Sequence, residues 1–415
     1  MIAGMDISHA FLCVAVTLSD FATNFGHTSM SKTRLLRITT VPISLKLLLE
    51  GQLSYFQQQG FEVMAVSAEG PEVKDIIDSG VRHEIVPMTR KITPFKDLVT
   101  LFNIIRIIRK FSPDIVHTHT PKAGLLGMMA AFLCRVPHRL HTVAGLPLME
   151  SGGLKRYLLV ATEKITYACA TKVYPNSRGL YNYIVENFST ITPVKVIGRG
   201  SSNGIDTDFF KRDGSLINEA KRIRYDHGIG DDEIVFSFVG RIVKDKGIGE
   251  LIAAFTSLLK SNERIRLLLI GPFERDLDPL SEADEAFLHN NRNVVLAGFQ
   301  RDVRPWLMAS DVFVFPSYRE GFPNVVMQAC CLEIPCIVSD INGCNEIIEH
   351  DVNGLIVPAK NVDRIRGAML LLMTDKEKRI SFAKKARQFV VANFDRRYVW
   401  EEIGKEYATT LNLKP

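Results

Sequence analysis

The sequence predicts an α/β protein of two Rossmann-like, doubly wound domains that face a central cleft. Short β runs alternate with amphipathic helical stretches, the pattern of parallel sheets covered by helices. This alternation restarts near residue 234, so two consecutive sheets fit the 415 residues better than one giant sheet. Sheets of this type bind ligands at the carboxyl ends of their strands, which places the expected site in the cleft.

Six short segments in each half of the chain are predicted to be strands. In the first half they are Leu35–Val41, Phe61–Ser67, Val81–Val86, Asp114–His119, Arg139–Val143 and Lys172–Pro175. In the second half they are Ile234–Val239, Arg266–Ile270, Asn293–Ala297, Val312–Phe315, Cys336–Ser339 and Leu355–Val357.

Helical periodicity fills the intervals between these strands. Phe95–Lys110 has apolar residues at helical spacing and a basic last turn, and Ile248–Leu259 follows a glycine-containing turn. After Asn361 the chain is predicted to be helical to its end. The Gly/Ser/Asn-rich segment Gly198–Asp208 is the predicted linker, so the domains are expected to span residues 30–200 and 205–395.

Composition excludes several classes of protein and reveals an uneven charge. With 46% hydrophobic and 23% charged residues, the chain is neither disordered, fibrous nor a small disulfide scaffold. The net charge of +5 is too small to indicate a nucleic-acid partner. Residues 81–200, however, carry 17 Lys/Arg against 6 Asp/Glu, a balance of +11 that leaves −6 for the rest. This part of the first domain should therefore lie beside something anionic.

The cysteines and the first residues indicate a cytoplasmic protein. The seven cysteines lack the paired spacing of a zinc site and are expected to be free thiols, as in a reducing cytosol. Residues 9–18 have no basic leader or convincing cleavage site, so a secretory signal is not expected. Basic residues and a strand follow Met30, so residues 1–29 are expected to be a disordered extension or to follow a misassigned start.

The first motif is Gly240–Gly247, which lies between a predicted strand and a predicted helix. Free backbone N–H groups and the positive end of a helix dipole favour an anion at such a place. Arg241 and Lys246 could clamp a diphosphate there. Basic loop residues are usually solvated, so the motif alone leaves a phosphate site and a solvated loop as alternatives.

The second motif, Ser317–Gln328, again joins a strand to a helix through a Gly/Pro turn. Glu320 lies at the turn, and Pro323 suits a first helical turn. A carboxylate at this position can accept hydrogen bonds from sugar hydroxyls. Taken alone, Glu320 is equally typical of a solvated turn acid.

The third motif, Asp114–Lys122, places His117 and His119 at the end of a buried strand in the basic half of the chain. Without further context such histidines are more typical of a hydrogen-bonded core than of a reactive site.

Together, in this order and spacing, the three motifs resemble the retaining nucleotide-sugar glycosyltransferases of family 4, which have the GT-B fold. The match runs from about Leu35 to the end of the chain and is most similar to bacterial enzymes of capsule and O-antigen synthesis. Four separate segments carry it: DIVHTHTPKAGLLG, SNGIDTDFF, FVGRIVKDKGI and FPSYREGFPNVVMQA.

The resemblance implies a role for each matching residue. Arg241 and Lys246 match the basic pair that binds the donor diphosphate, and Glu320 matches the first acid of a paired-acid motif that contacts the donor sugar. His119 matches a histidine that faces the reacting sugar. Further substrate-binding positions are the turn residues Gly321, Phe322, Asn324 and Val325, the nucleobase positions Gly298 and Phe299, Ser44 in an N-terminal loop beside the phosphates, and Gln328.

Two of these positions depart from the family pattern. Gln328 stands where the family usually has a second glutamate that binds the ribose hydroxyls. An amide still donates and accepts, but it lacks the stronger charge-assisted bond. The segment around Ser44 lacks the glycines that this loop often carries. We expect a working enzyme with the ribose site kept.

The resemblance also implies a reaction and its partners. The donor would be a nucleoside-diphosphate sugar, with a uridine diphosphate hexose or N-acetylhexosamine expected, and the acceptor a saccharide on a polyprenyl diphosphate. Transfer would retain the anomeric configuration and need no metal or other cofactor. Asp206-Thr207-Asp208 resembles the D-x-D metal motif of a different glycosyltransferase fold, but it lies in the linker.

The second domain would bind the donor and the first the acceptor, with a C-terminal helix at about 397–415 packing back on the first domain. The uncharged stretch Ala123–Cys134 and nearby Arg135, Arg139, Lys155 and Arg156 could lie on the anionic inner face of the cytoplasmic membrane. The alternative is a buried helix with solvated bases beside it.

Two other functions fit the same architecture. Sugar-nucleotide epimerases share the two domains but do not usually carry the turn formed here by Glu320–Asn324. A non-catalytic sugar-nucleotide binding protein is suggested by Gln328 alone.

Overall fold

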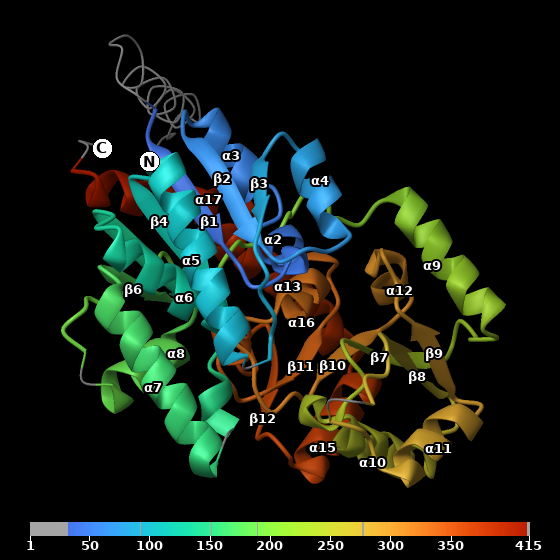
Figure 1. Cartoon of the computed structure of the whole chain (residues 1–415). Helices are drawn as coiled ribbons and strands as arrows, with labels where there is room; N and C mark the ends of the chain where they lie inside the picture. The colour runs from blue at the N-terminus through green and yellow to red at the C-terminus, as the bar shows by residue number, and fades with distance from the viewer. Residues whose placement is uncertain (1–31, 92, 151, 189, 276–277, 413–415) are drawn as a thin grey trace, which may run out of the picture.

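The structure is a computed structural model that describes residues 32–412 except 92, 151, 189 and 276–277. The expected extension, residues 1–29, lies outside the described part. Two parallel six-stranded sheets, each covered by helices, form two domains (Figure 1). The predicted fold class is therefore confirmed.

The first sheet has the strand order β3-β2-β1-β4-β5-β6. Its strands are β1 (Arg34–Ile38), β2 (Glu62–Ser67), β3 (Arg82–Ile85), β4 (Ile115–His119), β5 (His138–Val143) and β6 (Lys172–Pro175). Its helices are α2 (Pro42–Leu48), α3 (Gln52–Gln58), α4 (Glu72–Asp78), α5 (Pro94–Phe111), α6 (Pro121–Leu133), α7 (Gly153–Cys169) and α8 (Arg178–Asn187), with a 3-10 turn at Pro147–Glu150.

The second sheet has the order β12-β11-β10-β7-β8-β9. Its strands are β7 (Ile234–Val239), β8 (Ile265–Ile270), β9 (Val294–Gly298), β10 (Val312–Phe315), β11 (Cys336–Ser339) and β12 (Gly354–Val357). Around them lie α9 (Gly214–Asp226), α10 (Ile248–Leu259), α11 (Glu282–Asn290), α12 (Arg304–Met308), α13 (Asn324–Cys331), α14 (Cys344–Ile347), α15 (Val362–Thr374) and α16 (Lys376–Phe394), with a 3-10 turn at Lys244–Lys246.

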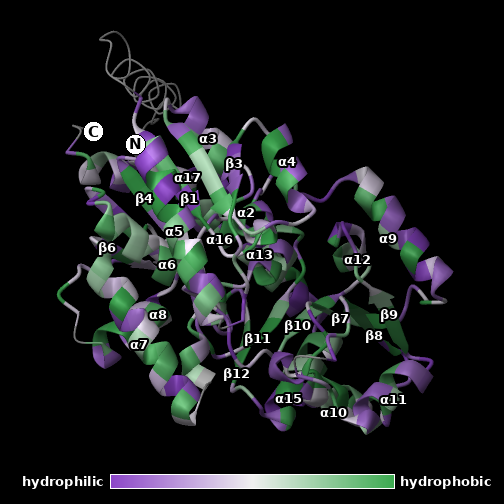
Figure 2. Cartoon of the chain, in the orientation of Figure 1, coloured by the Kyte–Doolittle hydropathy of each residue, from purple (hydrophilic) through white to green (hydrophobic). Residues whose placement is uncertain are grey.

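The strands of the second sheet are hydrophobic along almost their whole length because helices cover both faces. β8, for example, is buried from end to end apart from the half-buried Arg266 and is among the most hydrophobic segments in Figure 2. Parallel pairing then brings the carboxyl ends of the strands to one edge of each sheet. The loops that follow the strands are thereby gathered at that edge.

The last helix, α17 (Arg396–Thr410), packs on the first domain. Tyr407 lies within 5.0 Å of the Phe56 ring centroid and hydrogen-bonds to the buried Arg37 and to His117, 2.6 Å away. Arg37 also bonds to the Gln52 side chain, which reaches the linker backbone. The end of the chain therefore ties the linker region to the first sheet.

One local expectation is wrong, and at a second segment the structure decides between two alternatives. β1 ends at Ile38, and the segment around Ser44, expected as a loop, is helix α2, which Pro42 begins at its first position, where the missing N–H of proline costs nothing. The stretch Ala123–Cys134, weighed as a membrane-contacting helix, is mostly α6, which packs between α5 and α7 with most of its residues buried. The buried alternative is correct. None of the described helices is long and apolar enough to cross a membrane.

Candidate functional site

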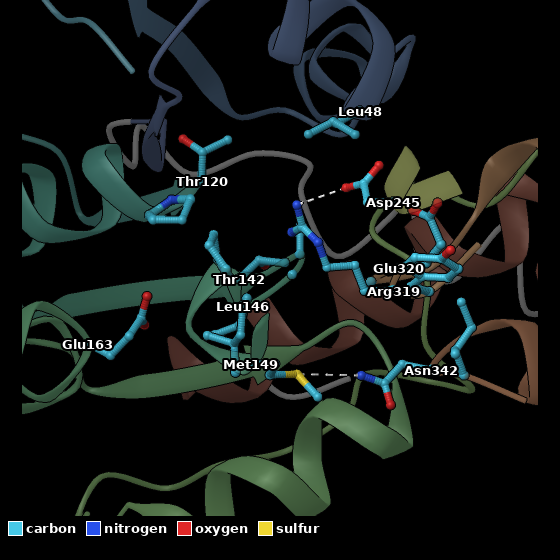
Figure 3. A pocket seen from close by; sticks show the side chains of 18 of the residues that line it. Leu48, Thr120, Thr142, Leu146, Met149, Glu163, Asp245, Arg319, Glu320 and Asn342 are labelled. Carbon is cyan, nitrogen blue, oxygen red and sulfur yellow. Dashed lines mark hydrogen bonds and ion pairs between the residues drawn. The ribbon is translucent and has the colours of Figure 1, made fainter. Parts of the chain in front are cut away.

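A cavity of about 520 Å³ lies between the carboxyl edges of the two sheets (Figure 3). This volume falls within the usual range for small-molecule sites. Both domains line the cavity. The first domain contributes Leu48, Thr120, Pro121, the segment 141–147, Met149 and Glu163, and the second contributes Arg241, Asp245, Lys246, the segment 318–321 and the segment 340–342.

The basic motif after β7 forms part of the second domain's wall. Gly247 ends the 3-10 turn with a left-handed φ of 70°, and a Cβ there would lie 2.1 Å from the Pro316 carbonyl oxygen. Only glycine fits such a position. This tight turn leads directly from Lys246 into α10, while Arg241 at the strand exit forms an ion pair with Glu274 at 3.1 Å. Both cations reach the cavity.

The acidic motif after β10 meets the basic motif. Lys246 Nζ forms an ion pair with Glu320 Oε1, and the Ser317 hydroxyl donates to the same oxygen at 3.2 Å. Both charged side chains are largely buried, 12% and 19% exposed. Arg319 pairs with Asp245 at 3.0 Å in the same region (Figure 3). The wall thus offers cations for an anionic group and a carboxylate for hydroxyl groups, close together.

Glycine allows the two domains to touch at this loop. A Cβ on Gly321 would lie 1.9 Å from the carbonyl oxygen of Ala144, which follows β5 in the first domain. Phe322 beside it is buried against Phe394, with ring centroids 5.1 Å apart. The Glu320 turn is therefore held between the domains, and the closeness of the two walls depends on Gly321.

A second contact between the domains lies further from the cavity. Glu346 of α14 accepts hydrogen bonds from the backbone N–H groups of Arg178 at 2.8 Å and Gly179 at 3.3 Å. These N–H groups lie in the first turn of α8 and have no partner within the helix. The Glu346 carboxylate accepts from them, and its negative charge interacts favourably with the helix dipole. At the cavity wall itself, the Asn342 amide of the second domain lies 3.8 Å from the Met149 sulfur of the first (Figure 3).

His119 lies behind the cavity rather than in its wall. Its ring is 2% exposed and stacks on His117 with centroids 4.5 Å apart, beside a smaller cavity next to Tyr174. Burial, and next the nearby Arg37, hold the pKa of His119 well below its ordinary value, so the ring is neutral. Thr120, the next residue, does line the main cavity. The catalytic role of His119 stays a prediction.

The other expected binding residues do not belong to the described lining of the cavity. Gly298 ends β9 with a φ of 64°, and the Phe299 side chain is exposed. Asn324, Val325 and Gln328 lie half-buried in α13, directly after the Glu320 turn, and Ser44 is buried within α2. All but Ser44 follow strands of the second sheet, so they share the edge from which Arg241 projects.

The acids of the D-x-D segment are used within the protein. Asp206 accepts backbone hydrogen bonds from Asp208 and Phe209 and pairs with Arg396 at 3.2 Å. Asp208 pairs with Arg397 at 2.8 Å. No cluster of three or more potential metal-ligating side chains occurs in the part of the chain that the structure describes.

Sequence reasoning did not identify the wall that the first domain contributes. Thr142 lies near the end of β5 and Gly145 in the loop that follows it, where the rule that ligands bind at strand ends could have found them. Glu163 had a weaker signal, because it is an acid on the buried face of an amphipathic helix. Burying a carboxyl group without a partner is costly, so such a residue is a candidate for function.

Comparison with known proteins covers both domains. A family model described as Glycosyl transferase 4-like matches residues 44–177, and one described as Glycosyl transferases group 1 matches residues 219–389. The capsular polysaccharide biosynthesis glycosyltransferase CapM of Staphylococcus aureus is 35% identical over 92% of this chain and 98% of its own. The UDP-Gal:alpha-D-GlcNAc-diphosphoundecaprenol alpha-1,3-galactosyltransferase of Escherichia coli is 29% identical over 81% and 86%.

Solved structures share the arrangement of the two domains. Anabaena HepE in complex with UDP and glucose superimposes with a TM-score of 0.76 at 18% identity, covering 91% of this chain and 100% of its own. Sucrose-phosphate synthase from Thermosynechococcus elongatus gives 0.75 at 18% identity, covering 92% and 100%. This likeness is one of fold, and the fold is the predicted GT-B arrangement.

Proposed function

The chain belongs to the group 1 glycosyl transferases, and on that premise we propose that it moves a sugar from a nucleoside-diphosphate sugar to a lipid-linked saccharide during synthesis of a bacterial surface polysaccharide. One observation carries the proposal. Arg241, Lys246 and Glu320 meet in the wall of the interdomain cavity. The names of the Staphylococcus aureus and Escherichia coli relatives, a capsular enzyme and an enzyme acting on a diphosphoundecaprenol-linked sugar, support it.

The donor is a uridine diphosphate hexose or N-acetylhexosamine. Arg241 and Lys246 bind its diphosphate, and Glu320 accepts hydrogen bonds from hydroxyls of its sugar. The turn from Gly321 to Val325 offers backbone N–H groups beside it, and Gln328 binds the ribose. The name of the Escherichia coli relative, which specifies UDP-galactose, supports a uridine donor.

Transfer proceeds by stabilising the leaving group. Breaking the bond between the sugar and the phosphate builds negative charge on the diphosphate, and fixed cations in the cavity wall stabilise that charge as it develops. Arg241 and Lys246 supply this positive charge, so the reaction needs no divalent metal. The acceptor hydroxyl attacks from the face that the diphosphate leaves, so the anomeric configuration is retained, and the leaving phosphate takes the proton.

A panel of nucleotide sugars tests the donor assignment by thermal unfolding. A ligand that binds the folded protein at a hundredfold excess over its Kd stabilises it by about 2.7 kcal/mol. For two domains of this size that corresponds to a rise in Tm of roughly 5 °C. We expect the rise with a uridine diphosphate sugar and with UDP, in the presence of EDTA. A rise that needs a divalent metal would contradict the metal-free clamp.

The same proposal places the enzyme at the cytoplasmic face of a membrane, and α5 and α7 provide the contact. Phe95, Leu98, Val99 and Phe102 form a stripe at helical spacing on α5, and Phe95 is 90% exposed. Leu154, Tyr157 and Leu158 are exposed at the start of α7, and exposed bases on both helices include Lys96, Arg106, Arg109, Lys110 and Lys155. Apolar side chains flanked by cations are typical of surfaces that bind anionic lipid.

Vesicle flotation tests this surface. We expect the protein to float with anionic vesicles, to float far less with neutral ones, and to lose binding when Phe95 and Phe102 are both replaced by serine. Tyr225→Ser is the matched control, because Tyr225 is an 86% exposed aromatic residue on α9 of the second domain. Equal flotation of the double variant and the wild type would contradict the assignment.

A further inference from the structure

One acidic side chain in the cavity wall has no part in donor binding. Glu163 of α7 lines the cavity and is 5% exposed. Burial raises the pKa of its carboxyl group to about 7, a rise that the Tyr167 hydroxyl partly offsets. Among the described residues, Glu163 Oε2 has no partner at hydrogen-bonding geometry. A leucine would satisfy a purely structural position at far lower cost, because an unpaired carboxyl group loses its hydration on burial.

Two further polar side chains lie in the same region. Tyr167, one turn further along α7, has a buried hydroxyl that lies beside the Glu163 carboxyl group without reaching hydrogen-bonding geometry with any described residue. Its ring centroid lies 6.4 Å from that of His141, which lines the cavity at the end of β5. Burial lowers the pKa of His141 to about 4, so its ring is neutral, and Nδ1 lies 2.8 Å from the Thr118 hydroxyl. No cation among the described residues pairs with the Glu163 carboxylate, so this part of the wall has unused hydrogen-bonding capacity.

Glu163 lies on the opposite side of the cavity from the donor residues. Figure 3 shows it on the first domain's wall, while Arg319 and Glu320 project from the second domain. Leu146 and Met149 lie between them and supply apolar surface. A pyranose ring has this combination of chemistry, with hydroxyl groups at its rim and C–H groups on its faces.

We propose that Glu163, positioned by the neighbouring Tyr167, binds hydroxyl groups of the acceptor saccharide and so selects the sugar to which the donor is attached. A sugar hydroxyl donates to the Glu163 carboxyl group, and the buried Tyr167 hydroxyl holds that carboxyl group in position. Leu146 and Met149 cover the ring. No bond breaks at this subsite. The inference rests on the proposed function, because it assigns the acceptor half of the same cavity.

Steady-state kinetics of Glu163→Gln test the subsite. The amide keeps the shape but cannot accept at both positions, so we expect the acceptor KM to rise at least tenfold while the donor KM and the rise in Tm caused by UDP stay unchanged. Tyr167→Phe, which removes one hydroxyl, should raise the acceptor KM by a smaller factor. Glu186→Gln, at an exposed acid on α8 of the same domain, is the matched control and should change neither KM.

Stability separates a binding role from a structural one. The pKa of Glu163 is higher in the folded protein than in the unfolded chain, so this group destabilises the fold increasingly as pH rises from about 4.5 to 7. Glu163→Gln should therefore raise Tm at pH 8 by several degrees and leave it nearly unchanged at pH 4.5. Loss of acceptor binding by a more stable protein supports the subsite.

Four results would overturn it. Glu163→Gln with a wild-type acceptor KM would make Glu163 a structural acid, and so would an equal rise in both KM values. A lower Tm at pH 8 would show that the carboxylate stabilises the fold. A wild-type protein that binds UDP but transfers no sugar to any lipid-linked saccharide would overturn the proposed function, and this inference with it.

Discussion

Replacing Lys246 with alanine is expected to lower kcat for sugar transfer by about a thousandfold, the upper range for losing one group that stabilises developing charge. The ammonium lies against Glu320 in the cavity wall, where little water can replace it. The donor KM should rise less, because the diphosphate bears its full charge only as the bond breaks. Steady-state kinetics with the donor in excess measure both quantities.

Lys244→Ala is the matched control for this variant. Lys244 lies in the same 3-10 turn, two residues before Lys246, but it is exposed and does not line the described cavity. It should keep wild-type kinetics, and both variants should keep the wild-type Tm to within a few degrees. Full activity in Lys246→Ala would refute the role of this residue in binding the diphosphate.

Gly321→Ala is expected to lower kcat by at least about a hundredfold through domain geometry. The added methyl group would lie 1.9 Å from the Ala144 carbonyl oxygen, so the two walls must separate or the Glu320 turn must shift. A displacement of about 1 Å at the reacting groups costs this much in rate. Arg241 and Lys246, which bind the donor diphosphate, remain in place, so the rise in Tm caused by UDP should persist.

Gly367→Ala provides the comparison. Gly367 lies in α15, and a Cβ there would meet nothing within 4 Å, so alanine should stabilise the protein by about 0.5–1 kcal/mol and leave kcat unchanged. If Gly321→Ala kept wild-type kcat, the domains would not need the close approach seen at Ala144 during transfer.

Periodicity was enough to predict most of the fold. Strands β6, β7, β10 and β11 and helix α10 have the predicted bounds, and the other predicted strands differ by a few residues at their ends. Hydrophobic runs flanked by glycine and proline define these elements locally. The segment around Ser44 was predicted wrongly because the family resemblance implied a loop, whereas Pro42 favours the first turn of a helix.

The site could be predicted on one side of the cavity only. Arg241, Lys246 and Glu320 follow strands of one sheet, so strand order and spacing bring them together. The position of the opposite wall depends on how the two domains pack together. The close approach of Gly321 to Ala144 belongs to that packing, which no local sequence pattern encodes. The position of His119 behind Thr120 likewise depends on packing.

The uneven charge of the sequence has a structural counterpart. Its basic stretch, residues 81–200, contains both α5 and α7, whose exposed apolar residues mark the proposed membrane surface. The helix first weighed for that role, α6, lies between them and is buried. The uncharged composition of α6 is therefore that of a core helix.

The transfer reaction itself tests the central claim most directly. The protein is incubated with uridine diphosphate sugars and a saccharide on polyprenyl diphosphate, in EDTA, and the lipid product is analysed by mass spectrometry and NMR. The account predicts a lipid-linked saccharide extended by one sugar that keeps the donor's anomeric configuration. Conversion of the donor to an isomeric nucleotide sugar without an acceptor, or binding of the donor with no extended product, would contradict it.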